Sequence, residues 1–194
     1  MAQESASTAR HLDDYFEGLE TLRADFVQLV FDDRGREVER STGWLALARP
    51  GRFHWFYRQP YPQRLVADGE RLWLYDIELD QVTVKPLSEV LSAAPAALLS
   101  GAVDWRTAFR AEAPVIQGDL VWYRLRPKDP EASFTTLWLG FEGKSLRALE
   151  LQDALQRRTR LGFDKLERNI PVDGELFRFT PPPGVDVIGA DTIP

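Results

Sequence analysis

The sequence predicts a mainly β protein, an antiparallel sandwich or barrel of about eleven short strands. Short runs rich in apolar and aromatic residues recur about every 8–12 residues along most of the chain. Tight-turn signals such as Asp68-Gly69 and Glu142-Gly143-Lys144 separate these runs. Helical patterns occur in only two places, before the first strand and in one insert midway. We therefore expect a single domain over residues 1–194.

The first element is expected to be a helix over about residues 7–20. Leu12, Tyr15, Phe16 and Leu19 follow i, i+3, i+4, i+7 spacing, which places them on one helical face. Ser7 or Thr8 is a suitable cap for its start.

After this helix the pattern changes to that of strands, which carry apolar residues and end at turn signals. In the first half of the chain, the expected strands are 22–31, 37–48, 52–58, 64–67, 71–76 and 81–85. In the second half they are 107–113, 120–126, 134–141, 145–152 and 157–165. The tail 177–188 begins extended and is then stiffened by three consecutive prolines.

The insert 86–103 has no strand character. It is rich in Ala and Leu, and Pro95 divides it into two short helical pieces. Each piece is too short to be stable alone in water. Packing must therefore hold the insert in place, and little energy is needed to release it.

Strand 52–58 points to binding of an apolar molecule. Phe53, Trp55 and Tyr57 share one face by the two-residue strand period, while His54 and Phe56 lie on the other. The arginines at the entry to this strand are unusual for a plain core, because a guanidinium keeps its charge and needs acceptors.

Several strands are apolar on both faces. In strand 71–76, Leu72 and Leu74 alternate with Trp73 and Tyr75. A sheet with one face in water should alternate cleanly between apolar and polar residues, so both faces are expected to be covered. The helix and the insert are too small to fill the concave side of such a sheet. The remaining space is either packed with side chains or left as a cavity.

The composition excludes several classes of function. The net charge is -6, and the basic residues form no stripe, so we do not expect nucleic-acid binding. The chain has no cysteine, which excludes disulfides, thiolate chemistry and a lipidated-cysteine anchor. No nucleophile elbow, phosphate loop or dinucleotide fingerprint is present. We expect neither enzymatic activity nor a cofactor or metal site.

The residues resemble one known family. The segments that carry the resemblance are Phe26-Val27-Gln28, Gly43 to Trp55, Gln59-Pro60, Ala67-Asp68-Gly69, Leu72 to Asp76, Gln81-Val82, Phe177-Arg178-Phe179 and Pro182 to Val185. In this order and spacing they look like the outer-membrane lipoprotein carrier family, LolA, from about Leu12 to Ile188.

The resemblance implies an incomplete antiparallel β-barrel of eleven strands with a lid of short helices. It implies a periplasmic chaperone that takes acylated lipoproteins from an inner-membrane ABC transporter to an outer-membrane receptor, and we expect a monomer. Residues 1–7 lack the pattern of a signal peptide, so a periplasmic location presumes that a signal was removed.

The resemblance also assigns roles to residues. Arg49 corresponds to the arginine that holds the lid through hydrogen bonds to its backbone, and Phe53 to a position that lines the acyl cavity. The lid would be the insert together with the N-terminal helix, with Leu87, Val90, Leu91, Leu98 and Leu99 as its apolar residues. The residues expected to bind acyl chains are Phe26, Leu45, Leu47, Phe53, Trp55, Tyr57, Trp73 and Tyr75. The last two could exchange faces with Leu72 and Leu74.

Two other interpretations stay open. A lipocalin-like barrel could carry another small apolar ligand without any handover partner. A hydrolase with buried carboxylates is a weaker alternative, because no strand has paired inward Asp or Glu. The related membrane-anchored lipoprotein receptor is set aside, because its anchor requires a cysteine.

Overall fold

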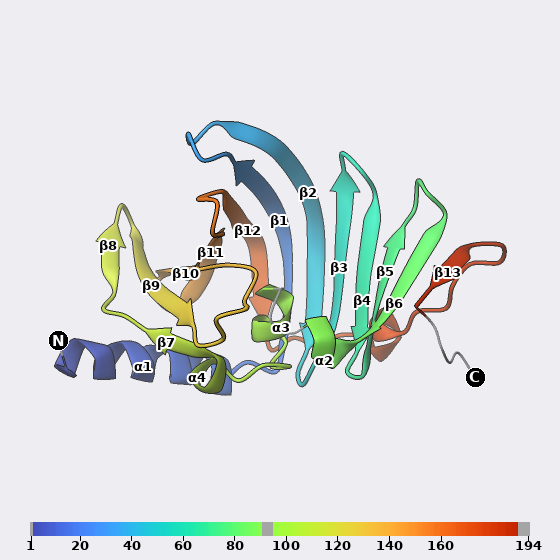
Figure 1. Cartoon of the computed structure of the whole chain (residues 1–194). Helices are drawn as coiled ribbons and strands as arrows, with labels where there is room; N and C mark the ends of the chain where they lie inside the picture. The colour runs from blue at the N-terminus through green and yellow to red at the C-terminus, as the bar shows by residue number, and fades with distance from the viewer. Residues whose placement is uncertain (1, 91–94, 190–194) are drawn as a thin grey trace.

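All the strands join one curled, open sheet. The computed structural model describes residues 2–90 and 95–189 of the chain (Figure 1). Its strand order is β13-β6-β5-β4-β3-β2-β1-β12-β11-β10-β9-β7, and β8 pairs with β9 beside β7. All pairs are antiparallel except β13 with β6. The sheet curls as a half-barrel but does not close, as expected of an incomplete barrel.

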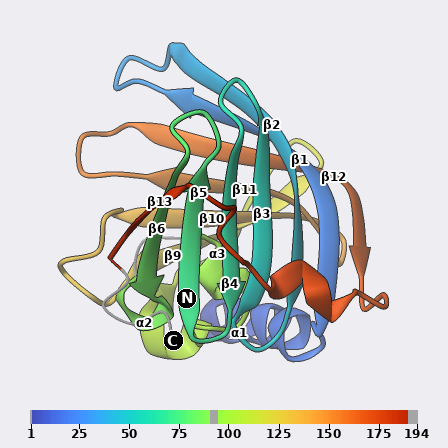
Figure 2. The same cartoon turned by 90° about the vertical axis from the view of Figure 1, so that its right-hand side faces the viewer.

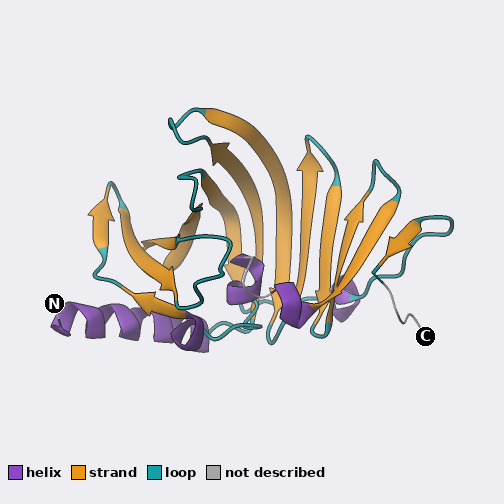
Figure 3. Cartoon of the chain, viewed as in Figure 1, coloured by secondary structure: helices purple, strands orange, loops and turns teal. Residues whose placement is uncertain are grey.

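The strands are β1 (Thr21–Phe31), β2 (Glu37–Ala48), β3 (Arg52–Gln59), β4 (Gln63–Asp68), β5 (Arg71–Asp76), β6 (Gln81–Pro86), β7 (Phe109–Ala111), β8 (Val115–Gln117), β9 (Leu120–Pro127), β10 (Thr136–Glu142), β11 (Ser145–Gln152), β12 (Arg158–Arg168) and β13 (Asp186–Ile188). The helices are α1 (Ala2–Glu17), α2 (Leu87–Val90), α3 (Pro95–Leu99), α4 (Trp105–Ala108) and the 3₁₀ helix η1 (Gly174–Phe177). Figure 3 shows how strands predominate over short helices.

The sheet has two faces with different coverings. We call the face that packs against α1 and α3 the inner face, and the opposite one the outer face. The helices lie near the end of the sheet where β1 begins and β6 ends (Figure 1). The inner face supports one large apolar core, to which α1, α3, β1 to β5 and β9 to β12 all contribute.

Three expectations from sequence need correction. The N-terminal helix runs from Ala2 to Glu17 rather than over residues 7–20, and it ends just before Gly18. The expected strand 107–113 is partly wrong, because Asp104 caps the one-turn helix α4 by accepting from Thr107 N at 2.8 Å. Only Phe109–Ala111 remains as a strand. The described residues form thirteen strands rather than about eleven, because the short strands β8 and β13 were not expected.

A C-terminal strap, residues 170–188, crosses the outer face (Figure 2). Within it, Phe177 is buried against Ala46 and Ala48. Phe179 packs near Trp73 and Tyr75, with ring centroids 6.3 and 5.8 Å away. The strap therefore covers outer-face residues that would otherwise meet water.

His54 helps to hold the strap on the outer face. Its Nδ1 lies 3.0 Å from the carbonyl oxygen of Leu176, and its ring packs on Trp44 at 4.7 Å between centroids. Burial lowers the pKa of His54, while the contact with the Leu176 carbonyl opposes this shift. His54 thus has a structural role, joining β3 to the strap.

We predict that Phe177→Ala destabilises the fold by about 3–5 kcal/mol, because it removes a buried aromatic ring and leaves a cavity over Ala46. Urea unfolding followed by tryptophan fluorescence measures this loss. Ile188→Ala, an exposed position on the same strap, is the control and should cost less than about 1 kcal/mol. Similar losses for the two variants would contradict a structural role for the strap.

Candidate functional site

Strands β1 to β3 give the inner face its aromatic wall. Phe53, Trp55 and Tyr57 of β3 share the inner face, as the strand period predicts, and Leu45 and Leu47 of β2 lie beside them. All except Tyr57 are fully buried, and Tyr57 is half-buried. Phe26 from β1 joins the same cluster. Six of the eight residues expected to bind acyl chains therefore come together on one surface.

A glycine allows this wall to pack tightly. The Phe26 ring lies 5.3 Å from Trp55 and 5.2 Å from Tyr57, measured between centroids. It lies across Gly43 of β2, where an added Cβ would come within 2.7 Å of Phe26 Cζ. An added Cβ would also lie only 1.9 Å from the backbone oxygen of Phe56, so a larger residue at position 43 would displace both the ring and strand β3.

The other two expected residues, Trp73 and Tyr75, lie on the opposite face. They pack with Val82, Val84 and Phe179 beneath the C-terminal strap. Leu72 takes the inner position instead and joins the main core. The expectation that Trp73 and Tyr75 share the inner face is wrong, because both faces of β5 are apolar and the strap covers the second one.

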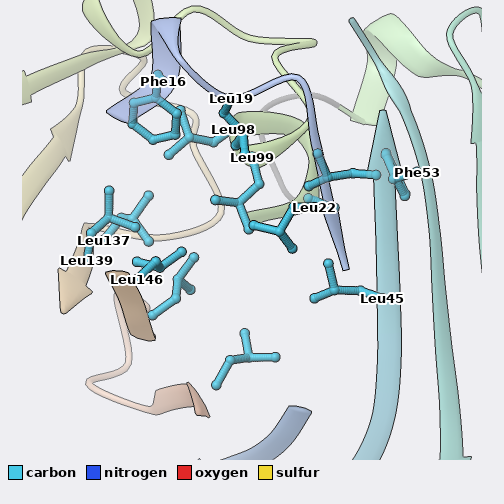
Figure 4. Close-up of a cluster of buried hydrophobic side chains, with 14 of the residues drawn as sticks. Phe16, Leu19, Leu22, Leu45, Phe53, Leu98, Leu99, Leu137, Leu139 and Leu146 are labelled. Carbon is cyan, nitrogen blue, oxygen red and sulfur yellow. The ribbon is translucent and has the colours of Figure 1, made fainter. Parts of the chain in front are cut away.

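Helical side chains occupy the space in front of this wall. Ala96, Ala97, Leu98 and Leu99 of α3 are all buried, and so is Leu87 of α2. From α1, Leu12, Tyr15 and Phe16 enter the same core. In Figure 4, Leu98 and Leu99 point into a space bordered by Phe16, Leu22 and Leu45. The helices therefore fill the inner face as well as covering it.

The lid segment, residues 86–103, is only partly described. Leu87, Leu98 and Leu99 take core positions. Leu91 lies outside the described residues, and the same holds for the side chain of Val90. Two backbone hydrogen bonds of 2.8 Å join the lid segment to turns of the sheet, from Gly51 N to Ser100 O and from Leu87 N to Glu70 O.

Arg49 lies where α1, the sheet and the lid segment meet. Its Nη1 donates to the carbonyl oxygen of Phe16 in the last turn of α1. Its guanidinium carbon also lies 5.9 Å from the centroid of the Phe16 ring. Burial lowers the pKa of Arg49, and the nearby Asp104 carboxylate opposes this shift. Arg49 therefore binds one carbonyl in the last turn of α1, where a cation is favoured.

Gly101 leaves room for the Arg49 side chain. It follows α3 with φ of +70°, and an added Cβ would lie 2.7 Å from Arg49 Cζ. The guanidinium therefore contacts the backbone of the lid segment at residue 101. Glycine is the residue type that fits both this space and the left-handed conformation. No local sequence pattern indicates this contact, because the two residues are far apart along the chain.

A second polar tie joins α1 to α4. Asp13 accepts from Arg106 Nε at 2.8 Å and from Trp105 Nε1 at 3.2 Å. Lys128 Nζ lies close to the Arg106 carbonyl oxygen, 2.5 Å away. Sequence reasoning missed Asp13 and Arg106, because nothing in their local patterns links them.

The inner face holds few polar atoms. Tyr57 donates to Gln28 Oε1 at 3.0 Å. Burial raises the pKa of Tyr57, and likewise that of Tyr15, to about 12, so both phenols stay neutral at ordinary pH. Within the described part of the chain, Tyr15 Oη and Trp55 Nε1 are buried without a hydrogen-bond partner.

Two pockets flank Phe134, which lies in the loop between β9 and β10. One, of about 370 Å³, lies between this loop, Val103 of the lid segment and Phe109. The other, of about 260 Å³, is lined by Val30, Leu151 and Thr159 near the β11–β12 turn. The rings of Phe134 and Phe109 stack with centroids 6.1 Å apart. Phe134 therefore lines two separate pockets, one beside the lid segment and one beside the β11–β12 turn.

The described residues contain no group of three or more His, Asp or Glu side chains placed to hold a metal ion. Nor does any helix among them have the length and apolar character to cross a bilayer.

Comparisons with known proteins agree on one family. A model of the family described as outer membrane lipoprotein carrier protein LolA matches residues 17–180. A protein from Halorhodospira halophila, named outer-membrane lipoprotein carrier protein, is 46% identical over 186 residues, which cover 96% of this chain and 88% of that protein. One of the same name from Dechloromonas aromatica is 39% identical over 184 residues, 95% and 88% of the two chains.

Solved structures show the same fold at low sequence identity. An uncharacterized conserved protein from Thermus thermophilus superposes with a TM-score of 0.60 at 14% identity, covering 94% of this chain and 98% of that one. A LolA superfamily protein from Nitrosomonas europaea gives 0.52 at 11% identity, covering 90% and 97%.

We predict that Gly101→Ala destabilises the protein more than Gly118→Ala. Both glycines have positive φ, +70° and +61°, but an added Cβ at Gly118 meets nothing within 4 Å. Both variants therefore lose about 1–2 kcal/mol of stability through the strained backbone. The difference between their losses measures the clash of the added Cβ with Arg49. We expect a further loss of about 1.5–3 kcal/mol in Gly101→Ala, the size of a charge-assisted hydrogen bond.

Urea unfolding measures both losses, and a double-mutant cycle tests the cause. In an Arg49→Ala background, Gly101→Ala should cost no more than Gly118→Ala. Equal costs for the two glycine variants in the wild-type background would show that Gly101 does not make room for Arg49.

Proposed function

The chain belongs to the outer membrane lipoprotein carrier family, LolA, and on that premise we propose that it is a periplasmic chaperone for lipoproteins. The carrier binds the acyl chains of its cargo against the inner face of the sheet. The observation that carries this proposal is the aromatic and aliphatic inner face, filled by short helices that a few polar contacts hold in place. We propose that it acts as a monomer, without catalysis and without a cofactor.

The free-energy cost of exposing acyl chains to water determines what a lipoprotein carrier must do. At about 0.8 kcal/mol per buried methylene, a sixteen-carbon chain in water costs on the order of 12 kcal/mol. A lipoprotein with about three such chains does not cross an aqueous space unaided. A carrier must offset most of this cost, yet bind weakly enough to release its cargo to an acceptor.

Acyl chains can displace the helical side chains that pack against the inner face. In the closed form, Leu98 and Leu99 occupy positions against the wall that acyl chains can take. Because α3 has five residues and α2 has four, neither is stable without its packing. Acyl chains and lid side chains then compete for the same surface, and closure expels the cargo.

Arg49 sets the balance between the two forms. A hydrogen bond from a guanidinium to a backbone carbonyl contributes about 1.5–3 kcal/mol. This favours closure in the empty protein and is small beside the burial of acyl chains. We propose that an inner-membrane ABC transporter drives opening and loads the cargo, and that an outer-membrane receptor accepts it. This cycle places the protein in the periplasm, with any signal peptide removed.

We predict that Tyr57→Ala weakens binding of a tripalmitoylated peptide at least fivefold, whereas Phe56→Ala leaves it within twofold. The two residues are neighbours on β3 and both are half-buried, but Tyr57 lies on the inner face and Phe56 on the outer face beside Arg64. Tryptophan fluorescence titration measures the affinity. A retinoid serves as the competing ligand, and tighter binding of the retinoid than of the peptide would favour a lipocalin-like carrier instead.

We further predict that Arg49→Leu slows transfer of bound lipoprotein to an outer-membrane receptor at least tenfold, because the open, loaded form is no longer opposed by the tie to α1. The transfer rate is measured with purified receptor and a fluorescent triacylated lipoprotein. Arg52→Leu is the control, since Arg52 lies over Phe177 on the outer face. A transfer rate like that of wild type in Arg49→Leu would remove Arg49 from the mechanism.

A further inference from the structure

Exposed apolar side chains gather at one end of the sheet. Among the described residues, eight large hydrophobic side chains are exposed, and four of them lie on consecutive hairpins. They are Leu79 on β5–β6, Tyr61 on β3–β4, Val38 on β1–β2 and Leu155 on β11–β12, exposed by 70, 69, 60 and 68%. We call these four hairpin ends the apolar arc. Isolated exposed apolar residues are ordinary, but one on each of four neighbouring turns is a pattern.

The arc lies at the end of the sheet away from the helices. The β1–β2, β3–β4, β5–β6 and β11–β12 turns share that end, as the strand register requires. The views in Figures 1 and 2 agree that these turns border the open end of the curl. Adjacent strands lie about 4.8 Å apart, so the β3–β4 and β5–β6 turns lie beside each other, whereas the β1–β2 hairpin extends past the end of β3 by residues 37–41 of β2. The pocket lined by Val30, Phe134 and Leu151 also contains Asp153 and Arg157 of the β11–β12 hairpin.

The turns hold their apolar residues in fixed positions. Asp76 Oδ1 accepts from the backbone N–H of Glu78 and of Leu79, both at 3.1 Å. Asp153 Oδ1 accepts from the N–H groups of Leu155 and Arg157, both at 2.9 Å. Tyr61 stands between two prolines. Rigid turns that present one large side chain each lose little freedom on binding, as expected of interface anchors.

The charges around the arc select the kind of partner. The hairpin ends 32–38, 60–62, 76–80 and 153–157 hold seven carboxylates and three arginines. An anionic bilayer would be repelled by such a surface, and so would a second copy of the same arc. The complementary partner is a protein surface with apolar pockets among Lys and Arg residues.

We propose that the apolar arc is a docking surface for a partner protein whose binding face is apolar and basic. This inference rests on the proposed function, in which the carrier must meet a donor and an acceptor. Tyr61, Leu79 and Leu155 are the anchoring side chains. The acidic groups beside them, Glu78 and Asp80 in particular, favour the encounter electrostatically.

The test uses the full chain with Tyr61→Ser, Leu79→Ser and Leu155→Ser combined, to remove the anchors. The matched control combines Val115→Ser, Ile116→Ser and Ile188→Ser, exposed positions outside the arc. Binding is measured by biolayer interferometry to two purified probes, the outer-membrane lipoprotein receptor and the periplasmic domain of the lipoprotein transporter. We expect the arc variant to bind at least one probe tenfold or more weakly, with the control within twofold of wild type. Glu78→Lys should weaken the same binding and reduce its dependence on salt.

Three results would overturn the proposal: no measurable wild-type binding to either probe, arc-variant binding within twofold of wild type to both, or an equal loss in the control. A further arm measures flotation with vesicles of phosphatidylethanolamine and phosphatidylglycerol. Wild-type flotation that the arc variant loses would assign the surface to a membrane and would also refute the proposal. Loading with a tripalmitoylated peptide, measured in parallel, distinguishes failure of the carrier function from failure of the docking proposal. Failure of wild type to load refutes the carrier function, whereas normal loading with unchanged docking refutes only the arc.

Discussion

The structure depends on an apolar surface that the sheet cannot cover by itself. Strands β1 to β5 and β9 to β12 turn leucines and aromatic rings toward a common interior, and an open sheet leaves that interior exposed. The hydrophobic effect requires a covering but does not specify which groups supply it. Short helices supply it in this conformation. Acyl chains offer the same kind of surface, so in the proposed function one face serves both folding and binding.

Polar contacts then decide how firmly the covering is held. Arg49 contacts the end of α1 and the backbone at Gly101, while Asp13 ties α1 to Arg106 of α4. Each contact is directional and small in energy compared with the burial of a lipid chain. In the proposed function, non-directional burial supplies affinity for varied acyl chains, and a few hydrogen bonds hold the helices in the closed arrangement.

Much of this arrangement is predictable from the sequence, because strong local signals agree with the fold. The bounds of β2, β5 and β11 coincide with the apolar runs between turns. The faces of β3 follow from its alternation. The alternation of β5 does not show which of its faces is the inner one, because Leu72 and Trp73 are both apolar. Only the strap, which covers Trp73, distinguishes the two faces. Strands β8 and β13 have three residues each and exist through their partners. Contacts across the chain, such as Asp13 with Arg106, leave no local pattern.

The pairing of β13 with β6 has a mechanical consequence. Strand β6 continues directly into α2, and it is hydrogen-bonded by β5 on one side and by β13 on the other. Strand β13 pairs only with Gln81 to Thr83, so the start of β6 is held between two neighbours, whereas Lys85 and Pro86, next to α2, pair with β5 alone. In the proposed cycle, the helices therefore move from the part of β6 that has a single strand partner, while β13 anchors the opposite end of the same strand in the sheet.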